Sequence, residues 1–293
     1  MIGDDRRMAG SRSMPPARIL LWVASIGALA VLVRSLLIAP VPTWAAASLL
    51  LLYLIITWVG WFYPQTGMYG EVLWRGPGND DRVALTFDDG PNPATTPKIL
   101  GILSRGGHRA TFFLVGRKVQ AHPELVREMH RAGHTLGLHG FVHDRLYAFK
   151  PPARVVADLQ AAQHAVAEAC GVRPTLFRPP MGHVSPRVVA GARRAGVTLV
   201  SWSVAGLDGL RGATSDRVVR RISRRLCGGT IAVLHDSAER DDFEPASVQA
   251  LPAILAEIDS RGLRTVGVDE FLPTDGRLGP GEPESSPTPR LRA

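Results

Sequence analysis

VALTFDDG, residues 83–90, is an apolar run that ends in two adjacent carboxylates and a turn residue. Short apolar runs of this kind are typical of buried strands, and parallel α/β folds keep their chemistry where such strands end. Because neighbouring side chains diverge, one carboxylate can bind a metal ion while the other takes a proton from a bound water. The alternative is a loop of solvated aspartates before Pro91, and these residues alone do not decide between the two.

His139 and His143 stand four residues apart in the segment HGFVH. This spacing places both imidazoles on one side of a helical turn, where they suit two nitrogen ligands of one ion. With one of the aspartates, the protein supplies three ligands. A catalytic zinc-type site uses that number and leaves one position open for water.

Two further segments carry polar groups at the ends of apolar runs. FRPPMG, residues 177–182, offers a fixed cation in a stiff turn, and IAVLHD, residues 231–236, is an apolar strand that ends in a titratable pair. Each of these segments alone is a weak signal.

In this order the four motifs resemble those of the polysaccharide deacetylase family, the NodB-like carbohydrate esterases of family 4. The signatures of that family run TFDDG, HxxxH, RPPYG and LxHD along the chain. The resemblance covers about residues 80–272. It implies metal-dependent removal of N- or O-acyl groups from sugars, and an α/β fold of the distorted (β/α) barrel type.

The resemblance implies a role for each matched residue on the metal side. Asp89, His139 and His143 would bind one divalent transition metal, with zinc as the first expectation, and Asp88 would be the general base. The cation would lower the pKa of a bound water and polarise the acyl oxygen. Arg178 resembles the arginine that orients the base, and its permanent charge would keep Asp88 ionised.

On the leaving-group side, His235 resembles the general acid that protonates the departing amine, since imidazole titrates near the working pH. Asp208 would tune this histidine. The backbone N–H of Met181 would help to bind the oxyanion, a role that tolerates Met in place of the family's usual Tyr.

Two departures from the family pattern concern the surroundings of these residues. Gly140 replaces the usual Ser or Thr after the first histidine, which removes a hydroxyl that would support the loop. In the segment WSVAGLDG, residues 202–209, one member of the family's acidic pair has become Ala205 and the following Trp has become Gly209. The apolar wall of the acceptor subsite is therefore missing, which makes the usual polymeric substrates a poorer fit.

The rest of the catalytic region alternates between strand and helix patterns, which predicts a parallel sheet or barrel. Apolar runs predict strands over 83–87, 110–115, 135–138, 176–177, 197–202, 230–234 and 265–268. Amphipathic stretches predict helices over 96–104, 122–132, 153–169, 186–195, 214–226 and 247–261. We expect a basic tail over 1–18, two transmembrane helices over 19–63, a linker over 64–79, the catalytic domain over 80–272 and a disordered tail over 273–293.

The remaining histidines and the two cysteines have ordinary explanations. Six histidines lack ligand spacing to one another and are expected to be structural or solvated, although His183 lies two residues past Met181: they are His108, His122, His130, His134, His164 and His183. Cys170 and Cys227 are too few for a disulfide framework, so an inert thiol is expected for each. Gly171 is expected to cap the helix that precedes it.

A net charge of +8 comes almost wholly from arginine, and arginine pairs on predicted amphipathic helices are typical either of a solvated face or of a surface that binds an anionic partner. Nucleic acid is the weakest candidate because no recognisable binding motif accompanies the charge. A phospholipid headgroup or a sugar phosphate remains, and next to a membrane anchor headgroup attraction is the natural choice.

That anchor is predicted at the front of the chain. Residues 19–38, which include only Arg34 as a charge, and the charge-free residues 44–62 are each long enough to cross a bilayer, with Pro40 and Pro42 between them. A helical hairpin is favoured over a cleaved signal peptide, and over one span followed by an interfacial segment. We therefore expect a multi-pass protein of the cell (inner) membrane.

Arginine counting predicts which side the barrel occupies. Arg6, Arg7, Arg12 and Arg18 precede the first apolar run and Arg75 and Arg82 follow the second, while Arg34 alone lies toward the turn. The positive-inside rule then places the catalytic domain in the cytoplasm. The resemblance points the other way, because many relatives act on cell-envelope polymers outside the membrane.

The favoured function is thus a membrane-anchored, metal-dependent hydrolase that removes an N-acyl group, acetyl or formyl, from an amino sugar. A lipid-linked precursor is the candidate substrate if the barrel is cytoplasmic, and peptidoglycan or another envelope polysaccharide if it is periplasmic. A catalytically silent sugar-binding relative is the alternative of another class. The retained set of acids and bases argues against it, because a binding protein has no chemical use for that set.

Overall fold

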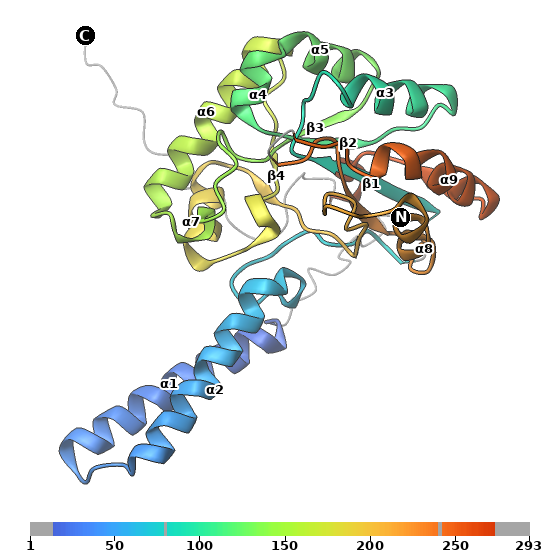
Figure 1. The fold of residues 1–293 in the computed structure, drawn as a ribbon. Coiled ribbons are helices and arrows are strands. Elements are labelled where there is room, and N and C mark those ends of the chain that lie inside the picture. The colour runs from blue at the N-terminus through green and yellow to red at the C-terminus, as the bar shows by residue number, and fades with distance from the viewer. Residues whose placement is uncertain (1–13, 79–80, 240–241, 273–293) are drawn as a thin grey trace, which may run out of the picture.

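The structure, a computed structural model, describes residues 14–78, 81–239 and 242–272. Arg6, Arg7, Arg12 and the tail predicted to be disordered lie outside the described residues. Within them, a curled parallel sheet lies inside a layer of helices, and two long helices at the N-terminus project away from this barrel (Figure 1).

The sheet is built around the strand that carries the aspartates. Within the described ranges its order is β5-β4-β3-β2-β1-β7-β6, with β8 beside the start of β1, and all pairs are parallel. The strands are β1 (Arg82–Asp88), β2 (Thr111–Leu114), β3 (Thr135–Leu138), β4 (Leu176–Phe177), β5 (Thr198–Leu199), β6 (Val204–Ala205), β7 (Ile231–His235) and β8 (Arg264–Thr265). Residues 197–202, predicted as one strand, form only β5 before the chain leaves the sheet.

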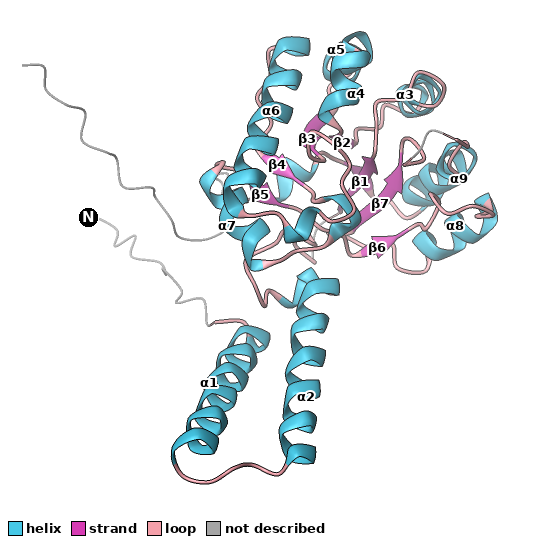
Figure 2. Cartoon of the chain, turned by 60° about the vertical axis from the view of Figure 1, so that its left-hand side comes forward, coloured by secondary structure: helices cyan, strands magenta, loops and turns pink. Residues whose placement is uncertain are grey.

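The helices cover the outer face of the sheet (Figure 2). They are α3 (Thr96–Arg105), α4 (Gly116–Ala121), α5 (Pro123–Arg131), α6 (Pro152–Cys170), α7 (Pro186–Arg194), α8 (Ser215–Ser223) and α9 (Ser247–Ser260), with short 3-10 turns at η2 (Tyr147–Phe149), η3 (Pro180–Gly182) and η4 (Val268–Phe271). Helix α4 was not predicted from the sequence. Gly171 ends α6 in the left-handed conformation, at φ 78°, as predicted.

The core lies between sheet and helices. Phe87, Phe112 and Leu138 point from neighbouring strands into one cluster with Val126 of α5 and Leu159 of α6. Burial of each such side chain stabilises the fold by roughly 1.5–3 kcal/mol. Because β1 is buried almost throughout, the pairing of its last residues with β2 and β7 is fixed by this core.

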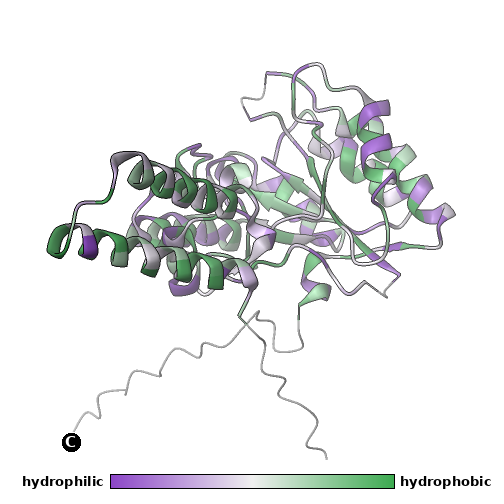
Figure 3. Cartoon of the chain, turned by 90° about the horizontal axis from the view of Figure 1, so that it is seen from below, coloured by the Kyte–Doolittle hydropathy of each residue, from purple (hydrophilic) through white to green (hydrophobic). Residues whose placement is uncertain are grey.

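The N-terminal helices form an antiparallel pair, α1 (Pro16–Leu37) and α2 (Thr43–Phe62), whose surface is apolar (Figure 3). Helix α1 has no buried residue and α2 has only Gly60, and their mean hydropathies are 2.1 and 2.0. At about 1.5 Å per residue, α1 is roughly 33 Å long, which is enough to span a hydrocarbon core. The hydroxyls of Ser25 and Tyr53 lie 3.3 Å apart between the helices.

The segment between α2 and β1 packs on the barrel. It begins with η1 (Pro64–Thr66), and its Met68 and Leu73 are buried. Leu73 forms a parallel bridge with Val200 at the end of β5. The guanidinium of Arg18 donates to the carbonyl of Gly67 at 3.0 Å, which ties the start of α1 to the same segment.

Candidate active site

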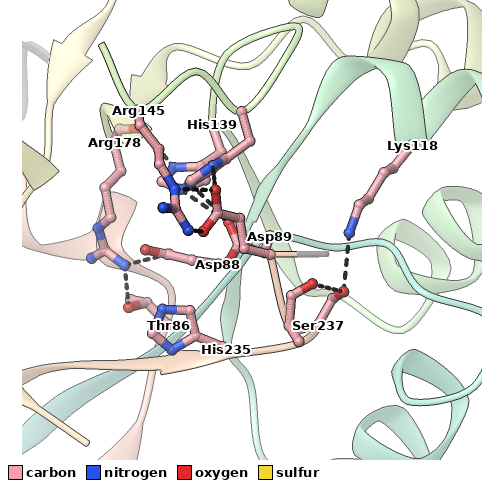
Figure 4. A network of polar contacts seen from close by, with 12 residues as sticks. Thr86, Asp88, Asp89, Lys118, His139, Arg145, Arg178, His235 and Ser237 are labelled. Atoms are coloured by element: carbon pink, nitrogen blue, oxygen red, sulfur yellow. Dashed lines mark hydrogen bonds and ion pairs between the residues drawn. The ribbon is translucent and has the colours of Figure 1, made fainter. Parts of the chain in front are cut away.

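The carboxyl ends of β1, β3, β4 and β7 bring the predicted residues into one place (Figure 4). Asp88 pairs in register with His235 across β1 and β7, and Arg178 follows β4, the neighbour of β3. His139 and His143 come from the loop after β3. Sequence motifs that span about 150 residues therefore converge because their strands are parallel and adjacent.

The adjacent aspartates are separated by a change in backbone conformation. Asp88 is the last residue of β1, whereas Asp89 has φ 74°, in the left-handed region that few residues other than glycine adopt. The change sends the Asp89 carboxylate toward the histidines and leaves that of Asp88 beside Arg178 (Figure 4). Such a backbone costs of order 1–3 kcal/mol and is typical of functional sites.

Asp89, His139 and His143 form the only cluster of three such groups with metal-ligand spacing in the described part of the chain. The Nε2 atoms of both histidines lie 3.4 Å from Asp89 Oδ1, and the candidate ligand atoms are all within 4.8 Å of one another. The three side chains are at most 8% exposed.

The prediction that both histidines lie on a helical turn is wrong. Residues 139–143 form an irregular loop, because Gly140 has φ 80° and turns the chain out of any helix. A Cβ at this position would lie 3.1 Å from Asp158 Oδ2. A glycine here thus meets a conformational need, and the loop is held instead by the Asp158 carboxylate, which accepts a hydrogen bond from the backbone of Phe141 at 2.9 Å.

The donor set fits a divalent cation. Asp89 Oδ1 is buried and has no hydrogen-bond partner among the described residues, at the point where both Nε2 atoms converge. His139 Nδ1 lies 2.7 Å from the carbonyl of Arg178, to which it donates a proton, so its Nε2 carries the free lone pair. One carboxylate and two imidazoles with such support are typical ligands of a catalytic metal.

Electrostatics keep the carboxylate of Asp89 ionised. Burial opposes ionisation, but His139, His143 and His235 together hold the pKa of Asp89 well below its usual range. An anionic ligand is what a divalent cation needs in order to repay the loss of its own hydration.

A carboxylate that the sequence motifs did not indicate lies beside His143. Glu239 Oε1 lies 3.5 Å from His143 Nδ1, and Arg145 holds Glu239 through two bonds of 2.7 and 2.5 Å. No spacing rule links these residues, because Glu239 lies in the segment after β7 and Arg145 two residues past the second histidine. At 3.5 Å the Glu239 carboxylate acts on the imidazole through its charge, since His143 Nδ1 has no hydrogen-bond partner among the described residues.

Arg178 is fully buried and fixes Asp88. Its Nη1 donates to Asp88 Oδ1 and to Thr86 Oγ1, both at 2.7 Å, and its Nη2 donates to the carbonyl of Ser201 at 2.9 Å. The guanidinium lies 4.2 Å from the ring of Phe113. A buried ion pair with this many bonds holds the carboxylate in one orientation, as a general base requires.

The Asp208 carboxylate holds His235 in place. One oxygen of this buried carboxylate accepts from the backbone N–H of His235 at 2.7 Å, and the other lies 3.1 Å from His235 Nδ1. Burial alone would lower the pKa of His235, but Asp208, with Asp89 and Asp88 behind it, raises that pKa to about 9. His235 is therefore a cation at neutral pH and can donate a proton.

The segment around Asp208 is open. Leu207 has φ 58° and is 42% exposed, and Leu210 is 59% exposed. A Cβ at Gly209 would lie 3.1 Å from the ring of His235. Because glycine stands where the family pattern has a tryptophan, no aromatic side chain from this position covers the His235 ring.

One of the two titratable residues that end the segment 231–236 lies outside the site. Asp236, next to His235, turns away from the site and accepts from Thr96 Oγ1 at 2.7 Å, at the start of α3. A Cβ at Gly90 would lie 2.0 Å from the same carboxylate. The pair of titratable residues that ends β7 therefore divides between chemistry and packing.

Met181 and His183 lie on the turn after β4. Met181 has φ 61° in η3 and its side chain is 46% exposed. His183 joins no metal cluster. Its ring packs against Phe62 and Trp61 at the end of α2, at centroid distances of 4.7 and 6.3 Å, and burial lowers its pKa.

Among the residues that the structure describes, the other histidines lie outside the Asp89–His139–His143 cluster and the two thiols are free. His134, for example, is buried and accepts from the backbone of Ala110 at 3.3 Å.

The chain is similar in sequence and fold to several known proteins. The sequence profile of the polysaccharide deacetylase family matches residues 75–200. A peptidoglycan-N-acetylglucosamine deacetylase of Bacillus cereus is 34% identical over 205 residues, which cover 69% of this chain and 93% of that protein. A chitooligosaccharide deacetylase of Bradyrhizobium is 35% identical over 189 residues, with coverages of 61% and 85%.

Among solved structures, a family 4 carbohydrate esterase from Streptomyces lividans in complex with acetate has a similar fold. Its TM-score is 0.58 at 31% identity, and the match covers 64% of this chain and 93% of that one.

Proposed function

This chain belongs to the polysaccharide deacetylase family, and from that premise we propose that it hydrolyses the N-acyl amide of an amino sugar at a membrane surface. One observation carries the proposal. The Asp89 oxygen without a hydrogen-bond partner and the two histidine nitrogens converge beside a base fixed by Arg178 and an acid fixed by Asp208. A silent sugar-binding protein has no chemical use for a base and an acid that buried partners each hold beside a cluster of metal-ligand groups.

In this mechanism Asp89, His139 and His143 would hold one divalent cation, with zinc as the first choice for this donor set. When bound, the cation supplies Lewis-acid activation of a water and of the acyl carbonyl. Asp88 accepts the proton of the attacking water, since Arg178 holds its carboxylate in place through a hydrogen bond of 2.7 Å.

His235 completes the reaction at the leaving group. It is a cation at neutral pH, so it can give its proton to the amine nitrogen as the amide bond breaks. The Asp208 carboxylate stays on Nδ1, which leaves Nε2 as the donating atom. The backbone N–H of Met181 is the proposed donor to the oxyanion.

We also propose the domain arrangement on which this activity depends. Residues 19–63 anchor the protein as a transmembrane hairpin, 64–79 connect the hairpin, and 80–272 are the catalytic domain. Support comes from the length, hydropathy and exposure of α1 and α2. The arginine count favours a cytoplasmic barrel.

A lipid-linked N-acyl amino sugar suits this arrangement, because the open segment around Ala205 and Gly209 lacks the wall of a polymer subsite. The second candidate is an envelope polymer reached from the periplasm. It is favoured by the 34% identity to the peptidoglycan-N-acetylglucosamine deacetylase.

Mass spectrometry tests the activity. The full-length, zinc-loaded protein is incubated with lipid-linked and soluble N-acyl sugars, and loss of the acyl mass is followed. Asp88→Asn is the control, because it retains the proposed metal ligands but removes the base. Equal acyl loss by Asp88→Asn and wild type would reassign the base, and no loss from any sugar would refute the proposed hydrolysis.

Reporter fusions after Ala293 test the side of the membrane. A reporter active only in the cytoplasm should work, since two crossings return the chain to its starting side. Activity of a periplasmic reporter instead would contradict the double crossing and bring envelope polymers forward as substrates.

A further inference from the structure

A groove of about 550 Å³ lies between η1, which follows the hairpin, and α8. One wall is formed by Gln65 of η1 and by the segment from Trp202 to Leu207. The other wall is formed by five arginines of α8 and the turn after it: Arg217, Arg220, Arg221, Arg224 and Arg225.

These five arginines lack ion-pair partners among the described residues, and the sequence 217–235 contains no acidic residue. Some other exposed arginines of the barrel are paired, such as Arg145 with Glu239 and Arg261 with Glu257. Like charges three and four positions apart on a helix repel each other and destabilise it. An anion in the groove would remove that repulsion.

The groove connects the active site with the hairpin. Trp202 lies 5.6 Å from the guanidinium of Arg178, and Leu207 directly precedes Asp208. Gln65 lies three residues past the last residue of α2. An anion bound by the arginines would thus lie between the membrane end of α2 and the catalytic acid.

The rim of the active site is apolar on the same side. Large apolar side chains that are at least 38% exposed occur in the loops after β3, β4 and β6: Val142, Leu146, Phe149, Met181, Leu207 and Leu210. The ring of Trp61 in α2 lies 4.7 Å from that of Phe149, and Phe62 packs on His183. This rim therefore lies at the end of the membrane helix, where exposed apolar groups meet the interface.

We propose that the arginine groove binds the phosphate or diphosphate group that joins an N-acyl amino sugar to a membrane lipid. Guanidinium groups bind phosphate oxygens through paired hydrogen bonds, and a row of them suits a diphosphate. The lipid would remain in the bilayer beside α2 while the sugar reaches the metal cluster. This inference rests on the proposed function and adds the substrate's charged group to it.

The test compares two double variants of the full-length protein with the same change in charge. Arg220→Gln with Arg224→Gln removes two groove arginines on one face of α8, and Arg193→Gln with Arg194→Gln removes an exposed pair from α7. Binding of inorganic pyrophosphate is measured by calorimetry in detergent. Kinetics are measured in phosphatidylcholine nanodiscs with a polyprenyl-phosphate-linked N-acetylglucosamine, and in solution with a chitooligosaccharide.

The groove variant should bind pyrophosphate about tenfold more weakly or worse, as expected for loss of two charge-assisted contacts. Its KM for the lipid-linked sugar should rise by a similar factor with kcat retained, and the α7 variant should match wild type. Equal binding and equal KM in both variants would overturn the proposal. A parallel loss of kcat on both substrates would also overturn it, because it would indicate damage to the barrel.

Two further results separate the sources of phosphate and the two proposals. If phosphatidylglycerol competes as well as a polyprenyl phosphate does, the groove binds headgroups and the substrate assignment is wrong. If no sugar loses an acyl group but the groove variant alone loses pyrophosphate binding, the groove is supported and the proposed hydrolysis fails.

Discussion

The metal side of the active site is more deeply buried than the acid side. On the metal side, the side chains of Asp89, His139 and His143 are at most 8% exposed, and each imidazole has a partner behind it. On the acid side, the His235 side chain is 29% exposed and is held by the Asp208 carboxylate alone.

This difference indicates which parts of the family's sequence motifs can change. A metal site loses affinity if its ligands move by tenths of an ångström, so its surroundings are constrained. A leaving group needs one correctly protonated nitrogen, and the rest of that wall can follow the substrate. Accordingly, the three ligands are intact although Gly140 departs from the family pattern between them, whereas on the acid side Ala205 and Gly209 change the wall itself.

The largest expected effect separates binding from chemistry. His139→Ala should lose the metal and all measurable deacylation, whereas His235→Ala should keep the metal and lose about 10²–10⁴ in kcat, the usual contribution of a general acid. Metal analysis of the purified variants, together with acyl-release kinetics, measures both. Full metal content in His139→Ala would contradict the assignment of His139 as a metal ligand.

The next effect tests the support behind His143. Glu239→Gln removes the carboxylate at 3.5 Å from Nδ1 and should lower metal affinity by about 10–100-fold, as removal of such partners does in other metal sites. Activity at saturating metal should change much less. A competition titration with a chelator measures the affinity, and an unchanged affinity would mean that Glu239 serves only to pair with Arg145.

The acid side should respond to pH. His235 donates its proton only while protonated, so wild-type activity should fall as pH rises through about 9. Asp208→Asn removes the main group that raises this pKa, which should move the alkaline limb toward the ordinary histidine value near 6.5 and cost about tenfold or more at pH 8.

The pH profile of kcat checks this expectation. The variant should regain much of its activity at pH 6, where an unassisted histidine is still largely protonated. A uniform loss at all pH values, with the limb unmoved, would contradict the role of Asp208 as the group that sets the pKa of His235.

The smallest effect compares two glycines. At Gly90 a Cβ would lie 2.0 Å from the buried Asp236 carboxylate, so Gly90→Ala should lower the free energy of unfolding by about 1–3 kcal/mol. At Gly209 the nearest atoms belong to the His235 ring at 3.1 Å, and Gly209→Ala should cost less than about 1 kcal/mol. Chemical denaturation measures both, and equal losses would show that the acid side is as tightly packed as the base side.

Much of this site could be predicted because its residues end apolar strands. The parallel sheet then brings Asp88 beside His235 and places Arg178 next to the loop of His139. The helical turn at His139–His143 was wrong because four-residue spacing does not report backbone conformation, and Gly140 adopts φ 80°. The role of Glu239 could not be found, since a carboxylate nearly 100 residues after its histidine has no local signal.

The contact between α2 and the turn after β4 has a consequence for where the enzyme can work. A flexible tether would let a catalytic domain sample a range of heights above a bilayer. Here Trp61 and Phe62 pack directly on Phe149 and His183, so α2 and the turn after β4 are held together. In the proposed membrane arrangement this junction would fix the height of the active site above the bilayer, so the enzyme would act on sugars within that short reach and a more distant polymer would have to approach it.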